Sequence, residues 1–270
     1  MRSGMKTILV TGSTDGIGKQ TALVLAKSGA RVILHGRNRE KIDAAAADIR
    51  RVVSDAQLDG IAADFSSLKH VRAMAQQLLL KYPRLDVLIN NAGVYTKHRA
   101  LTEDGFEMTF GVNHLAHFLL TNLLLDALKA SAPARIVTVS SMVHAGAALD
   151  FENLQAEKSF NAHGAYALSK LANVLFSAEL AQRLQGTGVT SNALHPGVIG
   201  TKMLRAAFNM SGAGVESGAA TPVYLAVDPE VENSTGKYYS DRKIVRASPL
   251  ANDPEVRRRF WETSATLVGL

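Results

Sequence analysis

Short apolar runs rich in Val, Ile and Leu alternate with helical patterns along almost the whole chain. The runs lie at 6–10, 31–35, 58–62, 86–90, 134–140 and 189–194, with a further short strand at 237–240. The helical patterns lie at about 17–28, 39–51, 67–81, 104–130, 164–185 and 216–227, with a tail helix from Pro254 onward. This alternation predicts an α/β fold, a doubly wound (Rossmann-type) parallel sheet of about seven strands with helices on both faces.

The organisation of the chain favours one domain over residues 1–270, because no linker, repeat or low-complexity segment divides it. Two irregular segments, 142–163 and 200–215, follow strand ends, where open α/β sheets hold their ligands. Residues 202–215 mix large apolar side chains with two glycines. That mixture fits a mobile substrate lid at about 200–215, or equally a surface helix packed on the core.

Composition excludes several classes of protein. The chain has no cysteine, so it has no disulfide and no thiolate metal site. No apolar signal-peptide core precedes the first strand, and the longest apolar stretch, Phe118–Leu125, is far shorter than the ~20 residues that cross a bilayer. We therefore expect a cytoplasmic protein with no membrane span.

The net charge of +6 does not by itself point to nucleic acid. The basic residues are scattered, and the one dense run, Arg257–Arg259, lies on the tail helix. Such a run most often forms the solvent-exposed face of a helix. No nucleic-acid partner is predicted. His114 and His117 have no third ligand nearby, so we expect packing histidines and no metal site.

The segment Met108–Ala130 is apolar on more than the single stripe needed to face a sheet. Something besides its own sheet should cover it, and a second subunit is the simplest candidate. This pattern predicts a homodimer or homotetramer, with the helix at 164–185 alongside.

A glycine-rich turn, Thr11 to Gly18, joins the first strand to the first helix. Glycines at 12, 16 and 18 permit positive φ and close backbone approach, and the following helix directs its free N–H groups toward an anion. The turn predicts a dinucleotide diphosphate site, although such turns also occur as plain strand-to-helix connections.

Tyr166 and Lys170 are spaced i, i+4 in a helical pattern, so they lie on one face about a turn apart. A neighbouring ammonium stabilises a phenolate and lowers the tyrosine pKa toward the range useful for proton transfer. An exposed helix pair is the alternative. Ser140 and Ser141 end a strand, where a hydroxyl can bind a carbonyl oxygen or simply terminate the strand.

Two further polar positions fit a ligand groove. The run Asn90–Gly93 follows a buried strand and could line a cofactor with its backbone, or be an ordinary turn. Asn113 is polar in an apolar helix and should have its hydrogen bonds satisfied.

Taken in order, these elements resemble the short-chain dehydrogenase/reductase family over nearly the whole chain, including Asp64, Pro196–Gly197 and Thr201. The residues around Asn113, Tyr166–Asn173 and His195 look most similar to its retinol-dehydrogenase-like and WW-domain-oxidoreductase-like branch. The resemblance implies the catalytic roles. Tyr166 would be the general acid/base, Lys170 would lower its pKa and bind the nicotinamide ribose, Ser141 would polarise the carbonyl, and Asn113 would hold a proton-relay water.

Cofactor choice is expected at the end of the second strand, where the sequence offers Arg37 and no carboxylate. Arg37 can bind a 2′-phosphate, which predicts NADP(H); the alternative is a solvent-facing arginine and a relaxed preference. Asp64 and Phe65 should lie near the adenine, Asn90 near the adenosine ribose and Thr201 near the carboxamide. The expected cofactor-binding residues are Gly12, Ser13, Thr14, Gly16, Ile17, Gly18, Arg37, Asp64, Phe65, Asn90, Ala92, Gly93, Tyr166, Lys170, Pro196, Gly197, Val198 and Thr201.

The stretch between Ser141 and Tyr166 is about twice as long as in compact members of that family. It should add wall to the substrate site through His144, Phe151, Phe160 and His163. The hypothesis that best fits these features is an NADP(H)-dependent oxidoreductase that moves a hydride between nicotinamide and a small-molecule carbonyl or alcohol, expected to be lipophilic. The alternatives are a non-catalytic, redox-sensing NADP(H)-binding regulator and a sugar-nucleotide epimerase, although the region after residue 200 looks small for the latter.

Overall fold

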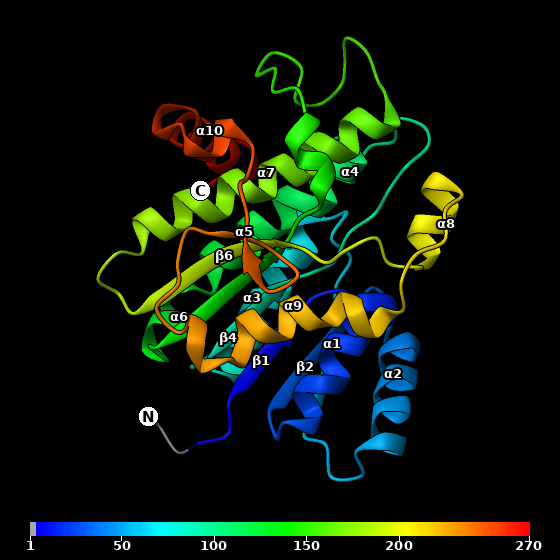
Figure 1. Cartoon of the computed structure of the whole chain (residues 1–270), viewed down its shortest axis with the longest axis vertical. Helices are drawn as coiled ribbons and strands as arrows, with labels where there is room; N and C mark the ends of the chain where they lie inside the picture. The colour runs from blue at the N-terminus through cyan, green and yellow to red at the C-terminus, as the bar shows by residue number, and fades with distance from the viewer. Residues whose placement is uncertain (1–3) are drawn as a thin grey trace.

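The computed structural model describes residues 4–270, and its centre is one eight-stranded sheet in the order β3-β2-β1-β4-β5-β6-β7-β8 (Figure 1). All neighbouring strands are parallel except β7 and β8. The strands are β1 (Thr7–Val10), β2 (Arg31–Gly36), β3 (Leu58–Ala62), β4 (Val87–Asn90), β5 (Ala134–Val139), β6 (Val189–His195), β7 (Tyr238–Ser240) and β8 (Lys243–Ile244). The predicted doubly wound fold is confirmed, with β8 as a short antiparallel addition.

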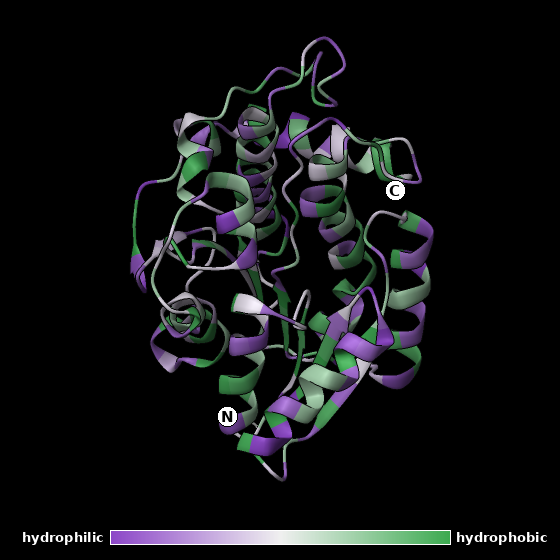
Figure 2. Cartoon of the chain, turned by 90° about the vertical axis from the view of Figure 1, so that its right-hand side faces the viewer, coloured by the Kyte–Doolittle hydropathy of each residue, from purple (hydrophilic) through white to green (hydrophobic). Residues whose placement is uncertain are grey.

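Helices cover both faces of the sheet. One apolar layer lies between the sheet and α1, α2 and α9, and the other lies between the sheet and α3, α5 and α7, with α10 packed on the outside of α5 and α7. The helices are α1 (Gly16–Lys27), α2 (Arg39–Val52), α3 (Leu68–Lys81), α4 (Met108–Phe110), α5 (Ala116–Leu123), α6 (Leu125–Ala130), α7 (Ala162–Arg183), α8 (Lys202–Phe208), α9 (Val215–Val227) and α10 (Pro254–Val268). Hydrophobic and hydrophilic residues interleave along the surface helices, as expected for helices with one buried face (Figure 2).

The predicted helix at 104–130 is interrupted. It begins only at Met108, where the buried Glu107 side chain accepts hydrogen bonds from the backbone N–H groups of Thr109 and Phe110. A π-helical turn, η1 (Gly111–Leu115), then separates α4 from α5, and a second break falls at Leu124. A π-turn inserts an extra residue into the helix, and such turns frequently occur at functional sites.

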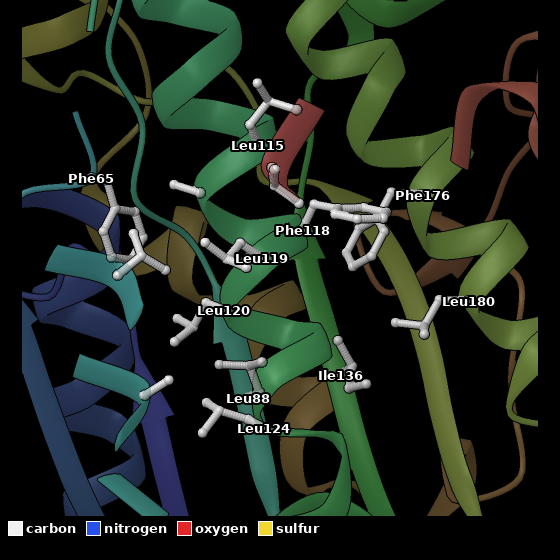
Figure 3. Packing of buried hydrophobic residues seen from close by; sticks show 14 of the residues in the cluster. Phe65, Leu88, Leu115, Phe118, Leu119, Leu120, Leu124, Ile136, Phe176 and Leu180 are labelled. Atoms are coloured by element: carbon white, nitrogen blue, oxygen red, sulfur yellow. The ribbon is translucent and has the colours of Figure 1, made fainter. Parts of the chain in front are cut away.

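The apolar surplus of this segment is covered from within the chain. Trp261 of α10 packs 4.8 Å from the ring of Phe118, and Phe260 packs 5.1 Å from His114. Phe118 and Phe176 of α7 lie side by side, with 5.5 Å between their ring centroids (Figure 3). The apolar surplus of Met108–Ala130 is therefore no argument for a second subunit, because α10 covers this face.

The segment 200–213 forms a flap closed at its base. Gly200 N–H donates to the Ala213 carbonyl and Ala213 N–H to the Val198 carbonyl, each at 2.9 Å. Within the flap, no residue of α8 is fully buried, and Met203, Leu204 and Phe208 are half-buried, so both the lid and the surface-helix interpretation remain open. Among residues 4–270, no helix combines the length and apolar character needed to cross a membrane.

Candidate active site

The glycine turn between β1 and α1 leaves no room for a side chain at Gly12 or Gly18. Gly12 and Gly16 have φ of +64° and +55°. A Cβ on Gly18 would lie 2.3 Å from the Gly12 carbonyl oxygen, and one on Gly12 would lie 2.8 Å from Cα of Ala92. Because the turn packs this closely and ends in the N-terminus of a twelve-residue helix, it fits a cofactor diphosphate.

Three predicted cofactor contacts instead point into the protein. Ser13 Oγ accepts from His35 N–H at 2.9 Å, and Asn90 donates to the Thr121 hydroxyl at 3.0 Å. The Phe65 ring stacks on His35 with 4.4 Å between ring centroids. All three side chains are buried and support the turn from below, so contacts of these residues with a cofactor would come from their backbone, and their place in the cofactor site stays a prediction.

Other predicted cofactor residues lie along the carboxyl edge of the sheet. Arg37 is exposed at the end of β2 and makes no ion pair within residues 4–270, while Asp64 accepts from Ser66 N–H at 2.9 Å. Thr201 caps α8 by accepting from Leu204 N–H at 3.2 Å. Its Cγ2 lies 3.5 Å from where a Gly16 Cβ would be. The structure therefore brings Thr201 to the glycine turn. Thr14, Ile17, Pro196, Gly197 and Val198 all keep some exposed surface there.

Tyr166 and Lys170 lie on one face of α7, with the lysine Nζ 5.5 Å from the centre of the tyrosine ring. Lys170 is buried, and its Nζ donates to the Val139 carbonyl at 3.2 Å. A Cβ on Gly93 would lie 3.7 Å from that Nζ and 3.3 Å from Asn113 Oδ1. The structure thus brings Gly93, Asn113, Tyr166 and Lys170 together.

The two serines after β5 differ in their contacts. Ser140 is buried, and its hydroxyl donates to the Lys170 carbonyl at 2.7 Å. Ser141 is partly exposed at the start of η2 (Met142–Gly146), and within residues 4–270 its hydroxyl has no hydrogen-bond partner. Ser141 is therefore the serine whose hydroxyl is free to bind a substrate.

The pKa values of Tyr166 and Lys170 differ from the expectation that the lysine lowers the pKa of the tyrosine. Burial raises the pKa of Tyr166 to about 12 and lowers the pKa of Lys170 to about 8. The predicted lowering of the tyrosine pKa by the lysine is not seen in this arrangement. The reason is local packing, because the rings of Tyr95 and Phe208 lie 5.6 and 6.2 Å from the Tyr166 ring, and burial disfavours the phenolate.

Asn113 lies in the π-turn, and both polar atoms of its side chain are hydrogen-bonded. Oδ1 accepts from Val94 N–H at 2.7 Å, and Nδ2 donates to the Val94 carbonyl and to the Ser169 hydroxyl, both at 3.0 Å. The side chain acts as a structural bridge, and a relay water could bind it only by donating to the second lone pair of Oδ1; the relay role stays a prediction.

Two of the residues expected to line the substrate site, His144 and Phe151, make contacts elsewhere in the protein. His144 is buried and accepts from Ser248 N–H at 3.0 Å, while Phe151 packs against Phe260 of α10. His163, by contrast, lies near Phe208 of α8, with 6.1 Å between ring centroids. The contacts of Tyr95 and Phe208 with Tyr166 were missed, because no sequence spacing connects these three segments.

Comparison with known proteins agrees with this geometry. The family model described as short chain dehydrogenase matches residues 6–212. Retinol dehydrogenase 14 of Mus musculus is 46% identical, with 98% of this chain and 86% of that protein aligned. Retinol dehydrogenase 13 of Homo sapiens is 48% identical, with 98% and 85% aligned.

Solved structures give the same result. An uncharacterized protein from Mycobacterium paratuberculosis is 34% identical, with a TM-score of 0.82 and coverage of 98% of this chain and 93% of that one. A short chain dehydrogenase from Escherichia coli complexed with NADPH is 28% identical, with a TM-score of 0.73 and coverage of 88% and 97%. The chain belongs to the short-chain dehydrogenase family, and it is an oxidoreductase by that membership. Within the family it is similar to retinol dehydrogenases.

Proposed function

We propose that this chain is an NADP(H)-dependent oxidoreductase that interconverts a lipophilic aldehyde or ketone and the corresponding alcohol. The observation that carries the proposal is the assembly of Tyr166, Lys170 and Gly93 at the same sheet edge as the glycine turn. Retinol dehydrogenases among the relatives and an NADPH complex among the structural neighbours support the reaction class and the cofactor.

The chemistry divides between the cofactor and the chain. When bound, the nicotinamide supplies or accepts the hydride. Tyr166 gives a proton to the carbonyl oxygen in reduction and takes it back in oxidation. Ser141 donates a hydrogen bond to that oxygen, where negative charge develops. Lys170, held by the Val139 carbonyl, places a positive charge beside the tyrosine when protonated.

The residues that would hold the cofactor are those the structure leaves accessible at the glycine turn and sheet edge. The first turn of α1 would receive the diphosphate, and Lys170 would bind the nicotinamide ribose. Arg37 would bind the 2′-phosphate, since its guanidinium has no ion-pair partner within residues 4–270.

A lipophilic substrate fits the surroundings of Tyr166. Tyr95 and Phe208 come from separate segments and meet at this side chain, and His163 packs on the Phe208 ring. An apolar substrate would be stabilised by burying its surface against the ring faces of Tyr95 and Phe208. The flap that carries Phe208 would act as the lid.

Replacing Tyr166 by phenylalanine tests the reaction. The change removes only the hydroxyl, so turnover of NADPH with aldehydes and ketones should fall by at least about a thousandfold, within the range for loss of an acid/base group. NADPH binding, measured by fluorescence, should be retained. Activity within tenfold of the wild type would refute the proposed role of Tyr166.

Arg37→Ala tests the cofactor assignment. Loss of a charge-assisted bond worth about 1.5–3 kcal/mol should reduce the preference for NADPH over NADH by roughly 10- to 150-fold in kcat/KM. Arg39→Ala is the matched control, because Arg39 on the next turn pairs with Asp43 instead. An unchanged NADPH-to-NADH ratio in Arg37→Ala would rule out Arg37 as the selector.

A further inference from the structure

A buried hydrogen-bond network lies directly under the glycine turn and is not used by the chemistry described above. At its centre, Thr11 Oγ1 accepts from the backbone N–H groups of Asn91 and Ala92, at 2.8 and 3.0 Å. The same oxygen lies 2.9 Å from Nε2 of His117 on α5. Thr11 and His117 are both fully buried.

The hydrogen positions in this network follow from counting donors. Nδ1 of His117 lies 3.0 Å from the Asn113 carbonyl oxygen, which can only accept, so Nδ1 carries the hydrogen. Nε2 is then an acceptor, and the Thr11 hydroxyl, whose oxygen already accepts two backbone N–H groups, donates to it at 2.9 Å, with the Ile89 carbonyl as a second, longer acceptor at 3.2 Å. Burial lowers the pKa of His117 to about 3, so the ring is neutral near pH 7.

The network continues from the π-turn to the catalytic helix. The Asn113 amide donates to the Ser169 hydroxyl at 3.0 Å, and that hydroxyl donates to the Tyr166 carbonyl at 2.8 Å. A path of hydrogen bonds therefore runs from Thr11 through His117, Asn113 and Ser169 to Tyr166. It joins the diphosphate turn to the backbone that carries the acid/base residue.

We propose that His117 is a positioning residue that couples the cofactor turn to the catalytic tyrosine through its two ring nitrogens. Nε2 fixes Thr11 and, through it, the glycine turn, while Nδ1 fixes the carbonyl of the π-turn and, through it, α7. The inference rests on the proposed function, since it concerns the same cofactor and the same tyrosine.

His35 provides an internal comparison, because it holds the same turn from the other side. Its Nδ1 accepts from Gly12 N–H at 3.1 Å, and its Nε2 donates to the Ala63 carbonyl at 3.1 Å. Phe65 lies between the two histidines, stacked on His35 and edge-on to His117 at 5.2 Å. His35 therefore supports the turn, but none of its hydrogen bonds reaches the π-turn.

Two conservative variants separate the two nitrogens of His117. The asparagine Nδ2 can replace Nδ1 as donor, so His117→Asn keeps the bond to Asn113 and loses the bond to Thr11. The glutamine Oε1 can replace Nε2 as acceptor, so His117→Gln keeps Thr11 and loses Asn113. Each variant breaks one hydrogen bond of a buried network. Loss of such a bond should change the affected constant, either the NADPH dissociation constant or kcat, about tenfold.

The experiment measures NADPH dissociation by fluorescence and kcat with an aldehyde for each variant. His117→Asn should raise the NADPH dissociation constant about tenfold with kcat within twofold of wild type. His117→Gln should lower kcat about tenfold with NADPH affinity within twofold of wild type. The control His35→Gln should weaken NADPH binding and leave kcat within twofold.

The outcomes decide between coupling and simple packing. If both His117 variants lower Tm but leave NADPH affinity and kcat unchanged, His117 only fills space and the inference is overturned. Nitrogen NMR of the cofactor-free wild type gives a second reading, since an Nε2–H tautomer of His117 would also overturn it. A wild-type protein that neither binds NADPH nor turns over would instead refute the proposed function, whatever tautomer is found.

Discussion

The helices α8 and α10 each bring one phenylalanine to an aromatic cluster, but they do so in opposite ways. Phe260 of α10 is 1% exposed and packs among His114, Phe110 and Phe151. No residue of α8 is buried, and Phe208 contacts Tyr95 and Tyr166 from the outside. An aromatic cluster alone therefore does not show whether a helix belongs to the core or covers the active site. The burial of the helix that carries the aromatic residue distinguishes the two.

The attachments of the two helices differ accordingly. α10 is fixed by buried contacts along its length, including Ser264 with His114 at 2.8 Å and Arg257 with the buried Glu179 at 3.7 Å. α8 is held by its closed base and by an exposed ion pair between Lys202 and Asp15 at 2.6 Å. Exposed pairs of this kind contribute little, so α8 is the helix that can move at low cost in free energy.

The comparison predicts that the same substitution has very different costs in the two helices. Phe260→Ala leaves a cavity in the core and should lower the free energy of unfolding by about 3–5 kcal/mol. Phe208→Ala should change it by no more than about 0.5 kcal/mol, as is usual for a surface position. Urea denaturation of both variants checks this. Equal losses would show that α8 is part of the core.

A second prediction concerns assembly, because α10 lies on the face that had suggested a partner. With this face covered by Phe260 and Trp261, we expect sedimentation at micromolar concentration to give one species near 28.9 kDa. A stable dimer would contradict the prediction and would have to use another face.

Loosening α10 with Phe260→Ala should increase self-association, since it exposes the apolar surface of α5.

Sequence patterns predicted the sheet and most helix limits because those depend on local periodicity. Apolar runs at 31–35 and 189–194 became β2 and β6 with shifts of one residue. The break at the π-turn was not predictable, because a single glycine, Gly111, does not specify a π-turn, and the geometry of this turn depends on hydrogen bonds of Asn113 to the distant Val94 and Ser169. The cover of α5 by α10 was missed for the same reason, since these segments are more than a hundred residues apart.

Among site residues, the sequence predicted which segments meet but not which way each side chain points. Gly12, Gly18, Tyr166 and Lys170 were placed correctly because backbone clearance and helical spacing are local properties. The inward direction of the Ser13, Asn90 and Phe65 side chains was not predictable, because each lies one position from a residue that faces the groove, and each contacts His35 or Thr121. Successive residues in extended chain point to opposite sides, so a correct segment leaves this choice open.

The smallest expected effect concerns Phe208 and the titration of Tyr166. Burial raises the pKa of Tyr166 to about 12. Phe208→Ala would admit water beside the ring and stabilise the phenolate, so this pKa should fall, by about one unit. Alcohol oxidation needs the deprotonated tyrosine, so the rising limb of kcat against pH should move to lower pH by the same amount.

Phe208→Leu is the control for this prediction, because leucine keeps an apolar cover over Tyr166 while removing the aromatic ring. The limb should then stay close to its wild-type position. If alanine and leucine variants shift it equally, the ring itself sets the pKa and not exclusion of water by α8. If neither variant shifts the limb, Phe208 does not cover Tyr166 during turnover, and α8 then lies away from the tyrosine.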